Sequence, residues 1–276
     1  MGNPGQGRLN HMLRSWVFDR ISHSLSKPLK RFYRSVTPPP PEPLMYRVHL
    51  FEELLDLAGR QTLRGKRILE IGPLDGLDSK RLGALEPAEL VMIDLPSKRE
   101  LTARWLPEIA CPHRYIEDNF MYMSEQALAE LGRFDLIWCT GVLYHNAEQL
   151  RFLRKLYKLL NIGGRLVLES STLRGPKRGS RAPRRLRAGL YVQVHYPQTY
   201  RDTGTITHLP TAGAITAWLR MVGFQDIRES RCYERENRDL IGRRMACIAT
   251  KTSEDDGDVY YGKSGLNPDY IFGESV

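Results

Sequence analysis

The chain has 276 residues, of which 41% are hydrophobic, so it can bury one substantial core and carry appendages at its ends. No apolar run reaches 18 residues, which argues against a membrane-spanning protein. The four cysteines are widely spaced without metal or redox spacing, and the N-terminus has no signal-peptide pattern, which predicts a reduced, cytoplasmic protein. The net charge of +9 favours an anionic substrate or partner.

The first 44 residues predict a basic helical extension and a proline-rich linker. Residues 10–36 have the pattern of an amphipathic helix broken at Pro28, with basic side chains along it. The prolines between positions 38 and 43 predict a stiff connection to the core. Such an extension could lie on a membrane surface, contact RNA or cover the active site, and we favour a lid or packing helix.

The segment RILEIGPLDGLDS, from Arg67 to Ser79, predicts a buried strand, a glycine-bearing turn and the first turn of a helix. Gly72 allows a sharp turn and leaves space for a ligand near the backbone. Together these parts form a cradle of nucleotide size. A dinucleotide site would have another glycine in place of Leu74, so NAD is disfavoured, and an ordinary strand-to-helix turn is the alternative. The residues assigned to cofactor contact here are Glu70, Gly72, Pro73, Leu74 and Gly76.

A second short apolar run, from Glu89 to Asp94, ends in an acid 24 positions after Glu70. A carboxylate at the tip of the second strand can accept hydrogen bonds from both hydroxyls of a ribose, and Leu95 would lie beside it. The alternative is a helix N-cap, because a proline and a serine follow closely. After the expected third strand, Asp118 and Asn119 could face an adenine amino group, with a turn as the competing interpretation.

Residues 133–139 predict a fourth buried strand that leads into TGVLYH at the edge where ligands of open α/β sheets bind. In this loop, Thr140, Gly141 and Tyr144 are assigned to the cofactor. The elements expected after it are a helix over 148–160, a turn at 161–164, a strand at 165–169, a helix over 211–222 and strands at 224–228 and 245–249.

The spacing of an acid, any residue, glycine, three residues and glycine resembles the first motif of class I S-adenosylmethionine (SAM) methyltransferases. GVLYH, GGRLVLES, HLPTAGAITAWLRMVGFQDIR and RRMACIATK are similar to the wobble-uridine tRNA carboxymethyltransferases and their relatives, roughly over residues 67–251. The resemblance implies an α/β, Rossmann-like fold with a seven-stranded, mostly parallel sheet, an antiparallel last strand and helices on both faces. The expected parts are the extension at 1–44, the methyltransferase domain at 45–252 with a substrate-side insert at 172–210, and a C-terminal tail at 253–276.

The resemblance also implies roles for particular residues. In that family the tyrosine of GVLYH and an arginine on the last strand hold the carboxylate of carboxy-SAM, and the matching positions are Tyr144 and Arg244. The family also uses a lysine near a Lys-Gly-Pro-Phe motif before the first strand, where this chain has TPPPPEPLMYRV. We therefore expect SAM as the cofactor, with carboxy-SAM as the less favoured alternative.

Methyl transfer from a sulfonium depends mainly on the alignment of nucleophile, methyl carbon and sulfur. A hydroxyl acceptor also needs a base, for which His145 is the first candidate, with His195 and His208 as the others. Each could instead be a structural polar residue. The sequence has no metal-ligand cluster, so we expect no metal. The residues assigned to substrate contact are Tyr144, His145, Tyr196, Tyr200, Arg201 and Arg244.

Basic residues crowd the stretch 174–187, within the substrate-side insert. Their forked donors suit the phosphates or carboxylates of an RNA, a nucleotide-sugar, an anionic glycan or a lipid head group, and a solvated loop is the alternative. The C-terminal tail is aromatic after an acidic loop, and we expect it to dock on its own chain or on a neighbour.

Three functions follow from these patterns. The favoured one is a SAM-dependent methyltransferase that acts on a hydroxyl of a small molecule or glycan, expected to be anionic. The second is a tRNA wobble-uridine methyl- or carboxymethyltransferase, which the basic insert supports and the missing lysine segment disfavours. The third is a catalytically silent SAM-binding partner subunit, against which the intact glycine loop, Asp94 and GVLYH argue. The patterns indicate no oligomeric state.

Overall fold

The computed structural model describes residues 50–53, 56, 60–173, 192–195, 206–230 and 244–254, all within the second of two units, His49–Val276. The expected extension at 1–44, the basic cluster at 174–187 and most of the expected tail lie outside the described residues. Within the described part of the chain, no helix has both the length and the apolar composition needed to cross a bilayer.

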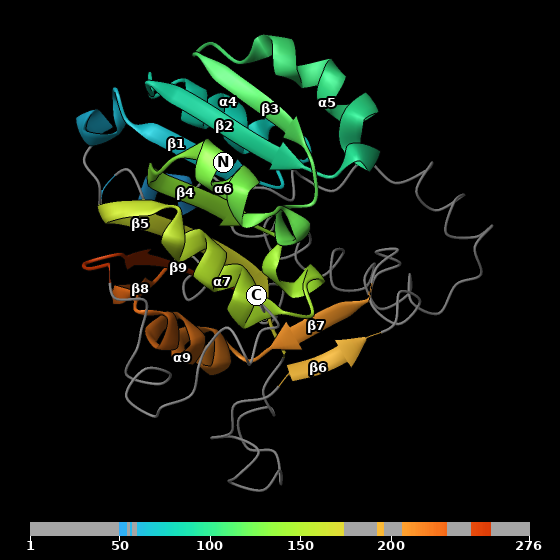
Figure 1. Cartoon of the computed structure of the whole chain (residues 1–276), viewed down its shortest axis with the longest axis vertical. Helices are drawn as coiled ribbons and strands as arrows, with labels where there is room; N and C mark the ends of the chain where they lie inside the picture. The colour runs from blue at the N-terminus through green and yellow to red at the C-terminus, as the bar shows by residue number, and fades with distance from the viewer. Residues whose placement is uncertain are drawn as a thin grey trace, which may run out of the picture. The chain divides into compact units, whose positions relative to one another are not determined.

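A seven-stranded sheet forms the centre of this unit, with its strands in the order β3-β2-β1-β4-β5-β9-β8 (Figure 1). The pairs β1–β2, β1–β4, β2–β3 and β4–β5 are parallel, whereas β9 runs antiparallel to both β5 and β8. This confirms the predicted Rossmann-like α/β fold with its antiparallel last strand. The strands are β1 (Arg67–Ile71), β2 (Glu89–Asp94), β3 (His113–Glu117), β4 (Phe134–Thr140), β5 (Leu160–Ser171), β8 (Gln225–Glu229) and β9 (Arg244–Thr250).

The central strands are covered on both faces because they are nearly continuous apolar runs. Ile68 of β1 lies beside Leu90 and Leu136 on the adjacent strands, and all three belong to one core cluster. The next residue, Leu69, points the other way and belongs to the second cluster. Each face therefore needs its own layer of helices.

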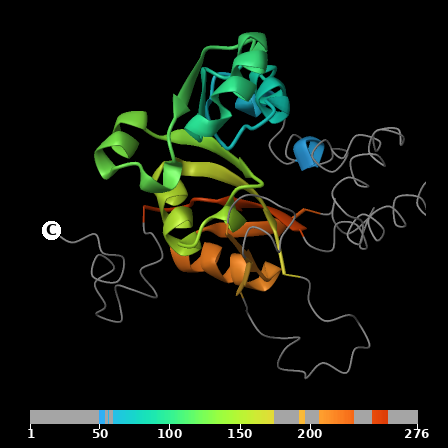
Figure 2. The same ribbon diagram turned by 90° about the vertical axis from the view of Figure 1, so that its right-hand side faces the viewer.

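Helices supply these two layers, as the two views show (Figures 1 and 2). One layer contains α4 (Leu77–Gly83) and α5 (Arg99–Trp105), and the other contains α6 (Glu125–Leu131), α7 (Gln149–Lys158) and α9 (Ala212–Val222). The short 3₁₀ helices are η1 (Arg60–Leu63), η2 (Pro96–Lys98), η3 (Leu106–Glu108), η4 (Phe120–Tyr122) and η5 (Leu143–His145).

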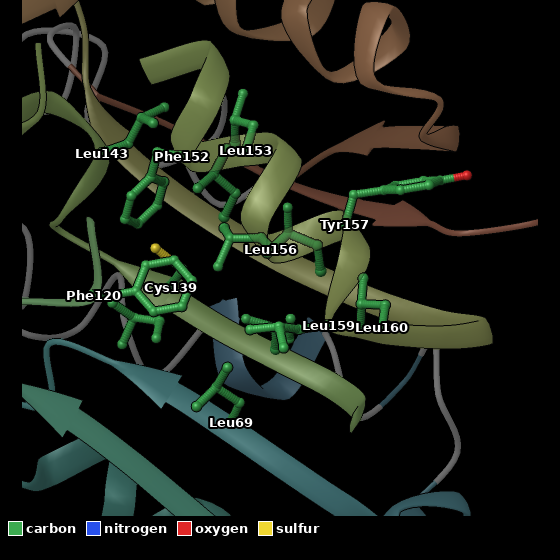
Figure 3. Packing of buried hydrophobic residues seen from close by; sticks show 14 of the residues in the cluster. Leu69, Phe120, Cys139, Leu143, Phe152, Leu153, Leu156, Tyr157, Leu159 and Leu160 are labelled. Carbon is green, nitrogen blue, oxygen red and sulfur yellow. The ribbon is translucent and has the colours of Figure 1, made fainter. Parts of the chain in front are cut away.

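Helix α7 packs its apolar side against the centre of the sheet (Figure 3). Its residues Phe152, Leu156 and Tyr157 are almost fully buried, and Phe152 lies close to Cys139 of β4. Phe120 of η4 meets Phe152 edge to face, with 5.3 Å between the ring centroids. This contact fixes the loop after β3 against α7, at the carboxyl-terminal edge of the parallel strands.

Two observed elements differ from the sequence-based expectation. The turn expected at 161–164 is part of β5, because the N–H of Gly163 donates to the Lys251 carbonyl at 2.7 Å and the N–H of Lys251 donates to the Gly164 carbonyl at 3.0 Å. A second sheet, formed by the antiparallel pair β6 (Val192–His195) and β7 (Thr207–Pro210), lies within the stretch that we assigned only as an insert.

A buried lysine ties α7 to the loop after β3. Lys155 is only 3% exposed. Its Nζ donates to the carbonyl of Met121 at 2.7 Å and to that of Met123 at 2.9 Å. These carbonyls lie in and just after η4, so the ammonium satisfies backbone groups that the short helix leaves unpaired.

We expect Lys155→Met to lower the free energy of unfolding by about 1–3 kcal/mol, because it leaves two buried carbonyls without their charged donor. Lys158→Met on the same helix is the control, since Lys158 is half-exposed and 4.0 Å from Glu125; it should change stability by less than about 0.5 kcal/mol. Urea denaturation of the two variants measures the difference. Equal losses would contradict the structural role of Lys155.

Candidate functional site

The strand order reverses between β1 and β4, and open α/β sheets bind ligands at the carboxyl end of the strands at such a point. The loops that leave this edge are 72–76 after β1, 95–98 after β2, 118–119 after β3 and 140–145 after β4. All the described segments that we assigned to the cofactor thus lie at one edge of the sheet.

The two glycines of the first loop are required by close packing as well as by backbone conformation. Gly72 has a φ of 71°, and a Cβ there would lie 2.5 Å from Cγ2 of Val142 in the loop after β4. Gly76 has a φ of 70°, and a Cβ there would lie 2.2 Å from the Trp105 ring. Gly72 thus brings the first loop against the GVLYH loop, and Gly76 brings it against the end of α5.

Asp94 joins the first loop to the end of β2. Its carboxylate accepts a hydrogen bond from the N–H of Leu74 at 3.1 Å and another from the N–H of Leu95 at 2.8 Å. Burial raises the pKa of Asp94, although these two N–H groups and the charge of Lys98 act in the opposite direction. Each carboxylate oxygen has a further acceptor position, so the group can still receive two hydroxyl donors.

The two residues that donate to Asp94 also expose apolar side chains. Leu74 is 44% exposed and Leu95 is 38% exposed, so both offer apolar surface beside the Asp94 carboxylate. A ligand with vicinal hydroxyls and a flat apolar group would match an acceptor between two apolar side chains.

The remaining predicted residues at the β1 and β3 ends have structural partners. Glu70 is buried and accepts a hydrogen bond from the Ser79 hydroxyl at 2.5 Å, and Pro73 lies between the two glycines. The N–H of Asp118 donates to the Asp94 carbonyl at 3.0 Å, which places Asp118 beside the site with its carboxylate exposed. The Asn119 side chain accepts from the N–H of Met121 at 3.1 Å and so caps η4.

The GVLYH loop brings aromatic and charged groups together. Gly141 has a φ of 76° and its N–H donates to the Glu169 carbonyl at 3.1 Å. The rings of Tyr144 and His145 lie with 4.1 Å between their centroids, and the Arg244 guanidinium carbon is 5.8 Å from the Tyr144 ring centroid. Tyr144 and Arg244, which the resemblance pairs, therefore lie together with His145 where β4 ends and β9 begins.

Glu169 is a member of this group that the sequence did not reveal. Its carboxylate accepts from Nε and Nη2 of Arg244, the latter at 3.0 Å, and its side chain is 2% exposed. Arg244 lies opposite Ser171 in the β5–β9 pair, so Glu169 is its diagonal neighbour on the same face. Only the antiparallel register could have indicated this ion pair.

Thr140 turns its side chain away from the loop. Its hydroxyl is 3.4 Å from Oδ2 of Asp78, which also accepts the Trp138 indole N–H at 2.9 Å. Asp78 lies in the first turn of α4 and is fully buried. Asp78 thus ties α4 to β4 through Trp138 and Thr140.

His145 is held neutral by its surroundings. Burial lowers the pKa of its imidazole to about 4, and the positive charges of Arg244 and Lys98 act in the same direction. At neutral pH the ring is therefore unprotonated, as a general base must be, and the lowered pKa also makes it a weaker base than an ordinary histidine.

Gln149 attaches the second sheet to the GVLYH loop. Its buried side-chain amide donates to the carbonyl of Leu143 in η5 at 3.2 Å and to the carbonyl of His208 in β7 at 2.8 Å. His208 is thereby held close to η5. For His195 the structure describes the backbone in β6, opposite Thr207, and Tyr196, Tyr200 and Arg201 lie outside the described residues.

In the parts of the chain that the structure describes, there is no group of three or more histidine, cysteine, aspartate or glutamate side chains able to hold a metal ion. The three cysteines in these parts, Cys111, Cys139 and Cys247, are buried and free.

Comparison with known proteins gives a consistent family. The model of the methyltransferase domain family matches residues 45–229. The tRNA U34 carboxymethyltransferase of Syntrophotalea carbinolica is 31% identical over 173 residues, which cover 60% of this chain and 47% of that protein; the enzyme of Idiomarina loihiensis is 27% identical over 180 residues, 62% of this chain and 47% of that protein. The chain thus spans about half the length of these relatives.

Among solved structures, a SAM-dependent methyltransferase from Listeria monocytogenes, described as putative, superposes with a TM-score of 0.55 at 13% identity, covering 75% of this chain and all of that one. At this identity the similarity concerns the fold alone.

The pH dependence of stability tests the environment of His145. Between about pH 4 and 6.5 the unfolded chain binds a proton at this imidazole that the folded chain does not, so the contribution of His145 to stability rises with pH through this window. Removing the imidazole with His145→Asn should therefore raise the Tm of the variant relative to wild type more at pH 4.5 than at pH 7.5.

His113→Asn serves as the control, because His113 is an exposed histidine on β3. Differential scanning calorimetry at both pH values gives the comparison. If the Tm difference between wild type and His145→Asn were the same at both, the imidazole would not be shielded as the structure indicates.

Proposed function

The chain belongs to the class I SAM-dependent methyltransferases, through the family whose model matches residues 45–229, and from this premise we propose that it methylates a hydroxyl of a small molecule or glycan. The observation that carries the proposal is the neutral, half-buried His145 at the end of β4, beside the loop assigned to the cofactor. A neutral imidazole at this place suits the removal of a hydroxyl proton during transfer.

The residues at the β1 and β2 ends fit SAM. Asp94 retains acceptor capacity for the two ribose hydroxyls, and Leu74 and Leu95 offer apolar surface on either side of it. Gly72 leaves the backbone of the loop accessible to the methionine half. SAM supplies a methyl group that its sulfonium has already activated, so the protein needs chiefly to orient the acceptor and exclude water.

The chain's own groups then account for acceptor chemistry. His145 accepts the proton of the acceptor hydroxyl as the oxygen attacks the methyl carbon, and Tyr144 packs on the imidazole and restricts its orientation. Gln149 holds β7 against η5, so the second sheet forms a wall of the acceptor side that carries His208. The net charge of +9 favours an acceptor with phosphate or carboxylate groups.

The Arg244–Glu169 pair favours SAM over carboxy-SAM. The guanidinium already donates two hydrogen bonds to a buried carboxylate, so it already has an anionic partner within the protein. A second carboxylate from the cofactor would have to share this cation with Glu169. Together with the absence of the Lys-Gly-Pro-Phe motif from the sequence, this supports ordinary methyl transfer.

A tRNA wobble-uridine modification is the second candidate. It is favoured by the relatives themselves, which are tRNA U34 carboxymethyltransferases with up to 31% identity to this chain, and by the strongly basic composition.

Asp94→Ala should weaken SAM binding about 10- to 100-fold, because hydrogen bonds from the ribose to a charged acceptor are lost. Glu130→Ala, which removes an exposed carboxylate on α6, should leave the affinity unchanged. Calorimetric titration with SAM, carboxy-SAM and a 2′-deoxyribose analogue of S-adenosylhomocysteine provides the measurement. The deoxy analogue should bind wild type less tightly than S-adenosylhomocysteine does, and the two should bind Asp94→Ala equally. If the deoxy analogue bound Asp94→Ala less tightly than S-adenosylhomocysteine does, Asp94 would not be the group that contacts the ribose.

Transfer of tritiated methyl from SAM to a panel of acceptors tests the substrate class. We expect the label to enter hydroxylated anionic compounds, such as nucleotide-sugars or acidic glycans, in a form that resists mild alkali as an ether does. His145→Asn should reduce this transfer about 100-fold or more while SAM binding persists. Label that enters bulk tRNA and is released by ribonuclease would establish the second candidate in place of the first.

A further inference from the structure

The first loop contains a residue in a conformation that its side chain disfavours. Leu74 has a φ of 51°, in the left-handed region that residues with a branched apolar side chain seldom adopt. It lies between two glycines that also have positive φ, Gly72 and Gly76, but it has no comparable freedom itself. The surrounding structure must therefore hold Leu74 in place.

Two side chains hold Leu74 by its backbone. Its N–H donates to Oδ2 of Asp94 at 3.1 Å, and its carbonyl accepts the indole N–H of Trp105 at 3.1 Å. The first partner ends β2 and the second ends α5, so the two hydrogen bonds come from neighbouring elements and set the rotation of this one residue.

Trp105 is itself fixed from both sides. It is 4% exposed, and its ring packs so closely on Gly76 that a Cβ there would lie 2.2 Å away. On the other side its ring meets Tyr115 edge to face, with 6.3 Å between centroids, and the Tyr115 hydroxyl accepts a hydrogen bond from Thr102 at 2.9 Å. The indole N–H therefore points at the Leu74 carbonyl from a rigid support.

We infer that Trp105 is a positioning residue for the cofactor: its indole N–H keeps Leu74 left-handed and thereby keeps the Leu74 N–H on the Asp94 carboxylate. This inference rests on the proposed cofactor site. Without the indole N–H, Leu74 relaxes toward negative φ, its N–H leaves Asp94, and the carboxylate keeps only the Leu95 N–H to orient it for the ribose. The loop then has to be ordered when the cofactor binds, and that ordering reduces affinity.

Trp105→Phe tests this directly, because phenylalanine keeps an aromatic ring near Gly76 and removes the donor together with one ring of the indole. We expect the dissociation constant for SAM to rise about 5- to 10-fold. Leu74→Gly supplies the rescue, since glycine adopts a positive φ without support. In a Leu74→Gly background, Trp105→Phe should change the dissociation constant by less than about twofold.

Tyr115→Phe is the matched control for packing around Trp105, because it keeps the ring that meets Trp105 and removes only the hydroxyl that accepts from Thr102; SAM affinity should not change. A purely structural role would give Trp105→Phe the same effect in both backgrounds, and that result overturns the inference. If the wild type binds SAM and Trp105→Phe binds it equally tightly, the inference is also overturned, and the proposed function is left intact. Failure of the wild type to bind SAM overturns both.

A second measurement uses the wild-type protein alone, in case Trp105→Phe does not fold. Hydrogen exchange followed by NMR should show the Trp105 indole proton and the Leu74 amide proton protected, and both signals should shift when SAM is added. Rapid exchange of either proton, or signals that SAM leaves unmoved, contradicts the inference.

Discussion

The buried carboxylate of Asp94 holds together the two strand ends on which the site is built. It accepts hydrogen bonds from the N–H groups of Leu74 and Leu95, and the Asp94 carbonyl accepts the N–H of Asp118. One residue thus connects the loops that follow β1, β2 and β3. A buried charge is tolerable only with such donors, so the loops and the carboxylate depend on each other.

The other half of the site is organised by charge balance at the ends of β4, β5 and β9. Glu169 is buried on β5 and takes two donors from Arg244, which packs near the Tyr144 ring. Burial lowers the pKa of His145, and the positive charges of Arg244 and Lys98 lower it further, so its imidazole is neutral at neutral pH. The two halves touch where Gly72 packs against Val142, the residue two positions before Tyr144.

Much of the architecture was predictable because it depends on local patterns. Apolar runs ending in Ile71, Asp94 and Cys139 predicted parallel strands, and the glycine turn after Ile71 marked the ligand edge. Helix α9 begins after its Thr211 cap and ends at Gly223, close to the expected bounds. The hairpin β6–β7 and the start of β5 at Leu160 were not predicted, because pairing with distant segments decides them.

By itself, the amino-acid sequence determined the fold class, the reversed last strand through its family resemblance, and the set of candidate residues near one sheet edge. The spacing of apolar residues, the positions of the glycines and the spacing of motifs encode these features within short segments of the chain. Only the tertiary structure decided that Trp105 holds Leu74, that Glu169 pairs with Arg244 and that Gln149 joins η5 to β7. These contacts join residues between 31 and 75 positions apart in the chain, and they follow from strand register and helix packing, which no local pattern specifies.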